Sequence, residues 1–210
     1  MTHVHRTRIK ICGLTREEDV CAVVESGADA IGFVFYPPSP RYVSFQRAAE
    51  LARLVPPFVT IVGLFVNPAR HYVEEALETV PLQVLQFHGD ESEADCTGYG
   101  LPYLKAARMR PGLDLLKYAA SFSSAQGLLL DAFVEGYGGG GETFDWSLIP
   151  SVLPLPLILS GGLHAGNVAE AVRCVRPWAV DVSSGVEAAK GIKDAARITE
   201  FVAGVQNAHG

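Results

Sequence analysis

The chain has 210 residues, of which 49% are hydrophobic and 19% charged, and its formal net charge is −6. This composition predicts a folded globular protein, and the length fits one large domain or two small ones. The negative charge argues against a general nucleic-acid surface, and no uninterrupted apolar run is long enough to cross a bilayer. The first ten residues contain no apolar signal core, so we expect a cytoplasmic protein without a membrane partner.

Short apolar runs alternate with helical patterns along the whole chain, as expected for parallel strands covered on both faces. Eight such units predict an α/β protein, a single (βα)8 TIM barrel with eight parallel strands over residues 1–210, in which residues 1–7 form a flexible N-terminus. A doubly wound open sheet is the alternative. The expected strands are residues 8–12, 30–35, 58–66, 82–88, 103–108, 127–131, 155–160 and 178–183.

The helices between these strands are predicted from capping residues and apolar stripes. A helix after the first strand is expected to end at Gly27, and the weakest helical pattern covers residues 91–97. The expected helix starts are Thr15 with Glu18 as a capping box, Asn67 followed by Pro68, Asn167, and Asp194.

Polar side chains gather where the predicted strands end. In a (βα)8 barrel the active site lies at the C-terminal ends of the strands, so residues from distant parts of the chain are expected to meet there. One polar strand end would mean little, whereas several together indicate a site. The residues at these ends include Cys12, His88, Arg108, Asp131, Ser160 and Asp181 to Ser183.

Two glycine-rich stretches follow the last two strands, residues 159–168 (LSGGLHAGNV) and 180–191 (VDVSSGVEAAKG). Glycines let backbone N–H groups approach a ligand, and a helix starting at Ser183–Ser184 would direct its positive end at a phosphate. Phosphate sites in barrels often use these two loops. The alternative is a pair of tight turns that bind nothing.

Three other features have both a functional and a structural interpretation. Arg41 lies in a proline-rich loop that would hold its guanidinium ready for a carboxylate, or it is an ordinary surface arginine. The glycines at 138–141 could let a loop close over a ligand, or form an irregular excursion. His88 could be a base, a hydrogen-bond donor or a buried strand-end residue.

Cys12 ends the first strand, on the same face as Arg8 and Lys10 and directly before Gly13. It is either a small core residue or a reactive thiol at the barrel mouth. The four cysteines form no C-x-x-C pair, so neither a zinc site nor a disulfide framework is expected.

The motifs KICGLT, YPPSPR, VGLFVN, LQFHGDE, LLLDA, GGGGETFDW, LSGGL and VDVSSGVE occur in this order. Together they resemble the phosphoribosylanthranilate isomerase family of tryptophan biosynthesis, over nearly the whole chain. One departure is that the family's glycine loop usually reads G-G-T-G or G-G-S-G, whereas here Gly138 to Gly141 precede Glu142. We therefore assign this loop no role.

The resemblance implies a (βα)8 barrel without metal or organic cofactor that converts N-(5'-phosphoribosyl)anthranilate into 1-(2-carboxyphenylamino)-1-deoxyribulose 5-phosphate, an Amadori rearrangement. It implies that Cys12 is the general base and Asp131 the general acid, and that Arg41 contacts the anthranilate carboxylate. Asp181 would lie beside the sugar hydroxyls, and His88 is taken as a further substrate-binding residue. The implied phosphate-binding residues are Gly161, Gly162, Ser183, Ser184 and Gly185.

These roles make chemical sense if Asp131 stays protonated through burial and if Lys10 lowers the pKa of the Cys12 thiol. Gly13 would keep the path to the thiol clear. The expected partner is a small phosphosugar, with no nucleic acid, and the protein is expected to be a monomer or a homodimer. Two other functions remain open, namely another phosphosugar enzyme such as an epimerase or a thiamin-phosphate-type synthase, and a catalytically silent barrel that binds a phosphorylated ligand.

Overall fold

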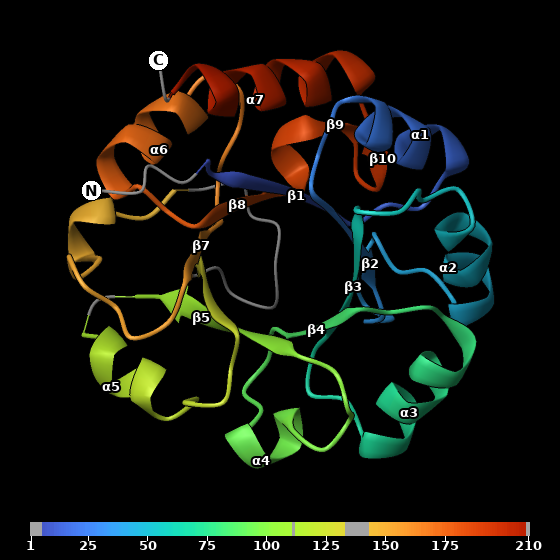
Figure 1. Cartoon of the computed structure of the whole chain (residues 1–210), viewed down its shortest axis with the longest axis horizontal. Helices are drawn as coiled ribbons and strands as arrows, with labels where there is room; N and C mark the ends of the chain where they lie inside the picture. Colours follow the sequence, from blue (N-terminus) through green and yellow to red (C-terminus); the bar gives the residue numbers. More distant parts are fainter. Residues whose placement is uncertain (1–5, 111, 133–142, 209–210) are drawn as a thin grey trace.

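The computed structural model describes residues 6–110, 112–132 and 143–208. Eight parallel strands form a closed barrel in chain order, which confirms the predicted architecture (Figure 1). Strand β1 pairs with β8 as well as with β2 and so closes the barrel. The strands are β1 (Arg8–Cys12), β2 (Ala30–Val34), β3 (Thr60–Phe65), β4 (Val84–Phe87), β5 (Tyr103–Met109), β6 (Gly127–Ala132), β7 (Leu157–Leu159) and β8 (Ala179–Val182).

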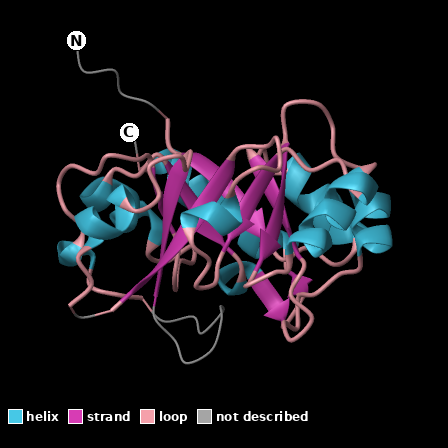
Figure 2. Ribbon diagram, turned by 90° about the horizontal axis from the view of Figure 1, so that it is seen from below, coloured by secondary structure: helices cyan, strands magenta, loops and turns pink. Residues whose placement is uncertain are grey.

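Helices surround the barrel, and the strands cross obliquely between them in the view of Figure 2. Between β6 and β7 the described residues form a single 3-10 turn, Trp146–Leu148, instead of an α-helix. The helices are α1 (Glu17–Glu25), α2 (Phe45–Ala52), α3 (Arg70–Thr79), α4 (Glu93–Cys96), α5 (Leu115–Ala120), α6 (Val168–Val175) and α7 (Ala195–Asn207).

The strands are apolar because both of their faces are covered. Ile9 and Ile11 of β1 are both buried. Phe65 of β3 has its ring centroid 5.3 Å from that of Phe35 and 6.1 Å from that of Phe87, so neighbouring units pack through aromatic contacts. Continuous apolar runs are what this packing requires.

Two of the predicted helix starts are wrong. Helix α1 has Arg16 at its N-cap, because the Thr15 hydroxyl donates instead to the carbonyl of Gly191, 2.6 Å away. Helix α3 begins after Ala69 and not at Asn67, whose side chain accepts a hydrogen bond from the Asp90 N–H at 2.7 Å. Both side chains connect separate loops rather than cap a helix.

The later helix starts fall where they were expected. The Asp194 side chain accepts hydrogen bonds from the N–H groups of Ala196 and Arg197, so it caps α7. Asn167 holds the N-cap position of α6, but its side chain accepts from the His164 N–H and so braces the preceding loop. The weakly patterned region 91–97 contains the short helix α4.

The chain after β8 differs from the prediction. In place of a longer helix starting at Ser183–Ser184, one 3-10 turn covers Ser184–Val186. It leads into a two-stranded hairpin, β9 (Glu187–Ala189) and β10 (Ile192–Lys193), which lies beside α1 in Figure 1 and was not predicted.

Some predicted features lie outside the described residues, namely residues 1–5 of the N-terminal segment and the glycines at 138–141. Arg6 forms an ion pair with Asp29, and Thr7 is buried and donates to the carbonyl of Pro177 at 3.2 Å. Among the described residues, no helix combines the length and apolar character that a membrane span needs.

Candidate active site

The expected site residues lie together around the C-terminal mouth of the barrel. Cys12 ends β1, Asp131 is the penultimate residue of β6, and His88 directly follows β4. Asp181 lies in β8, and Arg41 lies in the loop between β2 and α2. Parallel strands bring these separate parts of the chain to one end.

The Cys12 thiol lies in the space that a side chain on Gly32 would fill. A Cβ atom on Gly32, the β2 residue paired with Cys12, would lie 2.6 Å from the Cys12 sulfur. The expectation that Gly13 keeps the path to the thiol clear stays a prediction; the structure shows that Gly13 also makes room for the Arg41 side chain. A Cβ on Gly13 would lie 2.6 Å from Cδ of Arg41, so glycine is required for Arg41 to cross the backbone there.

The expected lowering of the Cys12 pKa by Lys10 is outweighed. Burial is the largest influence and raises the pKa of the thiol, and Asp181 raises it further. Lys10 and Lys193 lower it, as positive charges should, but the pKa stays above its ordinary value of 9.0. The thiol form therefore predominates at neutral pH, and the expectation of a lowered pKa is wrong.

Lys10 and Asp181 form a buried ion pair between β1 and β8. They are register partners, and Nζ of Lys10 lies 2.9 Å from Oδ1 of Asp181, with each side chain only 6% exposed. Burial lowers the pKa of Lys10, but the attraction of Asp181 and of a Cys12 thiolate more than offsets this, and the pKa is raised. Lys10 is thus a persistent positive charge below the thiol.

Asp131, the expected acid, has a partner that its sequence context does not reveal. Its Oδ2 lies 3.0 Å from Nε2 of His88, and Nδ1 of His88 lies 3.0 Å from the amide nitrogen of Gln86. An amide nitrogen can only donate, so Nδ1 accepts and Nε2 carries the hydrogen that His88 donates to Asp131. His88, for which the sequence leaves three roles open, therefore orients the carboxyl group of Asp131.

The two glycine-rich loops touch each other. A Cβ on Gly185 would lie 1.9 Å from the carbonyl oxygen of Leu163, so only glycine allows the loop after β8 to approach the loop after β7 this closely. Gly161 and Gly162 both have positive φ, 82° and 62°. The side-chain amide of Asn167 donates to the carbonyl of Gly162 at 3.0 Å and holds this loop in shape.

The same loops adjoin the two acid-base groups. The Ser183 hydroxyl donates to the backbone carbonyl of Cys12 at 3.0 Å. A Cβ on Gly161 would lie 3.0 Å from Oδ1 of Asp131. The region expected to bind phosphate therefore borders both Cys12 and Asp131.

Two charged residues of this site, Glu187 and Lys193, were not predicted from the sequence. Glu187 accepts two hydrogen bonds from Arg41, and Lys193 donates to both Glu187 and Ser183. Glu187 is the last residue of the VDVSSGVE motif and Lys193 lies six residues beyond it, and these positions are the only local signal, because the burial of both side chains depends on residues far away in the chain.

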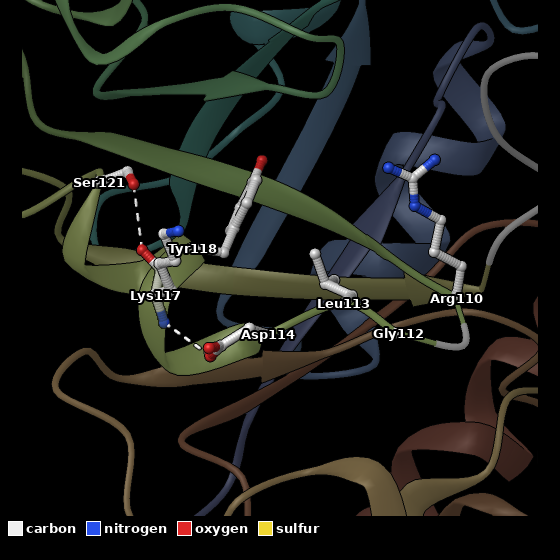
Figure 3. Close-up of a pocket in the computed structure, with 7 residues that line it drawn as sticks. All are labelled: Arg110, Gly112, Leu113, Asp114, Lys117, Tyr118 and Ser121. Carbon is white, nitrogen blue, oxygen red and sulfur yellow. Dashed lines mark hydrogen bonds between the residues drawn. The ribbon is translucent and has the colours of Figure 1, made fainter.

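A separate cavity of about 660 Å³ lies beside α5, lined among others by Arg110, Asp114 and Lys117 (Figure 3). None of the candidate site residues lines it. We therefore give it no part in the site.

A closed barrel whose strand ends carry a thiol, a carboxyl–imidazole pair and two interlocked glycine loops falls in the class of (βα)8-barrel enzymes. A family model described as N-(5'phosphoribosyl)anthranilate (PRA) isomerase matches residues 9–204. The chain belongs to this family, and it is an isomerase of tryptophan biosynthesis.

Relatives and solved structures agree with this assignment. N-(5'-phosphoribosyl)anthranilate isomerase of Dechloromonas aromatica is 68% identical over 203 residues, covering 97% of this chain and 98% of its own. That of Methylibium petroleiphilum is 65% identical over 203 residues, covering 97% and 95%.

Among solved structures, phosphoribosylanthranilate isomerase from Thermotoga maritima aligns with a TM-score of 0.89 and 42% identity, covering 96% of this chain and 99% of its own. A phosphoribosylanthranilate isomerase in complex with reduced 1-(o-carboxyphenylamino)-1-deoxyribulose 5-phosphate aligns with a TM-score of 0.84 and 40% identity, over the same shares of the two chains.

Proposed function

We propose that Cys12 and Asp131 catalyse the Amadori rearrangement of N-(5'-phosphoribosyl)anthranilate to 1-(2-carboxyphenylamino)-1-deoxyribulose 5-phosphate by general base and general acid catalysis. One observation carries the proposal. The loops after β7 and β8 touch each other, and they contact the carboxyl group of Asp131 on one side and the backbone of Cys12 on the other. A phosphate bound at these loops would hold the ribose between the two groups.

Asp131 acts first, by donating a proton to the ring oxygen of the ribose as the bond from C1' to this oxygen breaks. The lone pair of the anilinic nitrogen supplies the electrons, and an open-chain iminium ion results. The hydrogen bond from His88 Nε2 fixes Oδ2 of Asp131, so the other carboxyl oxygen is the one that faces Gly161. The substrate's own nitrogen drives this step, so the proposal requires no metal or organic cofactor.

Cys12 then removes the proton from C2', which gives an enolamine that tautomerises to the ketone. The raised pKa of the thiol means that little thiolate exists before the reaction starts. The iminium nitrogen brings a positive charge next to C2', and this charge favours the thiolate when it is needed. The thiol first releases its own proton to solvent and then takes the C2' proton, so Cys12 ends as the thiol that it was. Asp131, which gave its proton to the ring oxygen, regains one from solvent.

Arg41 is proposed to bind the anthranilate carboxylate through one edge of its guanidinium. The other edge, Nε and Nη2, already donates to Glu187, at 2.7 and 2.8 Å. The edge formed by Nη1 and the second hydrogen of Nη2 is the one left for substrate, which supports an end-on rather than a side-on contact.

Replacing Arg41 by lysine is expected to raise KM for phosphoribosylanthranilate about 10- to 100-fold, with a smaller effect on kcat. One ammonium cannot both pair with Glu187 and fork a carboxylate. Steady-state kinetics measures this, with Arg47→Lys, on the exposed face of α2, as the matched control. An unchanged KM in the Arg41 variant would remove Arg41 from the site.

Gly161, Gly162, Ser183, Ser184 and Gly185 are proposed to bind the substrate phosphate through backbone N–H groups. Inorganic phosphate is then expected to inhibit competitively, with a Ki in the millimolar range, roughly 4 kcal/mol. Gly162→Asp is expected to abolish this inhibition and to raise KM steeply.

The matched control is Gly162→Ala, because φ at this position is positive and any side chain there is strained. The charge of the aspartate should therefore add an effect beyond that of alanine. Equal KM values for the two variants would place the phosphate elsewhere.

The activity itself is tested by loss of anthranilate-type fluorescence when phosphoribosylanthranilate is supplied, with the product identified by mass spectrometry. Turnover of a different phosphosugar alone would favour another barrel enzyme, such as an epimerase or synthase. Tight binding of phosphoribosylanthranilate without turnover would favour a sensor or scaffold.

All proposed acid-base and phosphate-binding residues come from one barrel, so the chain is proposed to act as a monomer or as a homodimer, without a shared site. Its mass in solution, from light scattering, decides between the two. A cytoplasmic location is also proposed, supported by four free cysteines that a reducing compartment would maintain.

A further inference from the structure

The hairpin β9–β10 places two charged side chains inside the protein. The side chain of Glu187 is 6% exposed and that of Lys193 is 0% exposed, and they form an ion pair of 2.9 Å. Buried charges are costly unless each finds enough partners, so the partners of this pair indicate what it does.

Glu187 fixes the guanidinium of Arg41. Its Oε1 accepts from Nε of Arg41 at 2.7 Å, and its Oε2 accepts from Nη2 at 2.8 Å. Oε1 also accepts from Lys193 Nζ and, at 3.3 Å, from the N–H of Gly191. Burial raises the pKa of Glu187, but hydrogen bonds from Arg41 and Lys193 outweigh it and the pKa is lowered. Glu187 is therefore an anion that holds Arg41 by two contacts.

Lys193 fixes Ser183, at the start of the loop after β8. Its Nζ donates to the Ser183 carbonyl at 3.0 Å, to the Ser183 hydroxyl at 3.2 Å, and to Glu187 at 2.9 Å. These three contacts match the three hydrogens of an ammonium group. Because the Ser183 oxygen accepts from Lys193, its own hydrogen points to the carbonyl of Cys12. The ammonium thus sets the direction of the Ser183 hydroxyl.

The hairpin itself is attached to two helices. The backbone N–H of Lys193 donates to Asp19 of α1 at 3.2 Å, and Arg197 of α7 donates to the backbone carbonyl of Glu187. The pair therefore rests on elements outside the barrel mouth that do not depend on substrate.

We propose that Glu187 and Lys193 are positioning residues that hold Arg41 and Ser183 in one fixed arrangement. The two ends of the substrate, its carboxylate and its phosphate, would then bind to groups whose separation the pair determines. This inference rests on the proposed function for the assignment of Arg41 and Ser183 to these two ends.

The test compares Lys193→Met with Lys190→Met. Lys190 lies on the same hairpin and is exposed, and its replacement by methionine removes the same charge. Methionine keeps an unbranched side chain in the buried site, and Glu187 stays paired with Arg41. Lys193→Met is expected to weaken inorganic phosphate binding, measured by calorimetry, and to raise KM, each about tenfold, while Lys190→Met changes neither by more than about twofold.

A double-mutant cycle separates positioning from general stability. If Lys193 acts partly through the Ser183 hydroxyl, the loss of phosphate affinity in the double variant should be smaller than the sum of the losses in Lys193→Met and Ser183→Ala. Fully additive losses, or a Lys193→Met protein with a lower melting temperature but unchanged KM and phosphate affinity, would overturn the proposal.

Should Lys193→Met fail to fold, Glu187→Gln provides the test. Its KM is expected to rise about tenfold as Arg41 loses its ionic partner, and an unchanged KM in the folded variant would overturn the role of Glu187. Phosphate calorimetry needs no turnover. A wild-type protein that binds phosphate but does not convert phosphoribosylanthranilate would therefore contradict the proposed function. The phosphate affinities of Lys193→Met and Lys190→Met would still test the role of Lys193.

Discussion

Replacing Cys12 by serine is expected to lower kcat by about 10²- to 10⁴-fold, with KM changed by no more than about twofold. A serine hydroxyl is far less acidic than a thiol, even than a thiol whose pKa burial has raised. The variant therefore lacks a base for the C2' proton at neutral pH. The fold should survive, because serine is smaller than cysteine and the space beside Gly32 already accommodates sulfur.

The matched control is Cys21→Ser, the same substitution at an exposed position of α1. Its kcat and KM are expected to equal those of the wild type. A Cys12→Ser enzyme that turns over within a few-fold of wild type, with its fold verified by circular dichroism, would make Cys12 a packing residue and leave the base unassigned.

The barrel could be predicted from the sequence because its determinants are local. A parallel strand covered on both faces must be largely apolar, and this shows directly in a run such as the three leucines at 128–130. The observed strand ends differ from the predicted ones by one or two residues; the strand predicted at 82–88, for example, covers Val84–Phe87. Pairing with the neighbouring strands decides where a strand ends.

The capping residues were harder to predict because a capping side chain can bind elsewhere. Thr15 and Glu18 match the capping-box pattern, yet the Thr15 hydroxyl binds Gly191, which is 176 residues away. Asp194 met no such competitor and does cap α7. A local pattern predicts a cap only when no long-range partner is closer.

The same reasoning explains what was found and missed in the candidate site. Strand-end positions placed Cys12 and Asp131 at the mouth, because the fold alone brings strand ends together. The partner of His88, however, is Asp131, 43 residues later, and Glu187 binds Arg41 across 146 residues. Such pairs depend on the register between loops, which one sequence does not display.

The pKa of Cys12 illustrates a further limit. The sign of each influence could be foreseen, since Lys10 lies two residues away on the same strand face. The balance between these influences could not be foreseen. Burial of the thiol outweighs the effect of Lys10 on its pKa, and Asp181, which pairs with Lys10, raises the pKa of the thiol further. Only the assembled barrel sets the size of these opposing influences.

Replacing Asp131 by asparagine is expected to lower kcat by about 10²- to 10⁴-fold with little change in KM, because the variant has no proton to give to the ribose ring oxygen. The geometry should persist. The side-chain carbonyl of asparagine can still accept the hydrogen that His88 donates from Nε2, now 3.0 Å from Oδ2 of Asp131. The fall in kcat therefore measures the contribution of the transferred proton, because the shape of the site is unchanged.

Asp90→Asn is the matched control, since Asp90 is an exposed carboxylate in the loop after His88 that pairs with Arg108. Its kinetics are expected to stay within about twofold of wild type. Asp131 would cease to be the acid if its asparagine variant kept near-normal kcat. A variant that lost activity only through a raised KM would instead show that Asp131 binds the sugar. The proton would then have to come from another group at the mouth, and His88, 3.0 Å from Asp131, would be the first to examine.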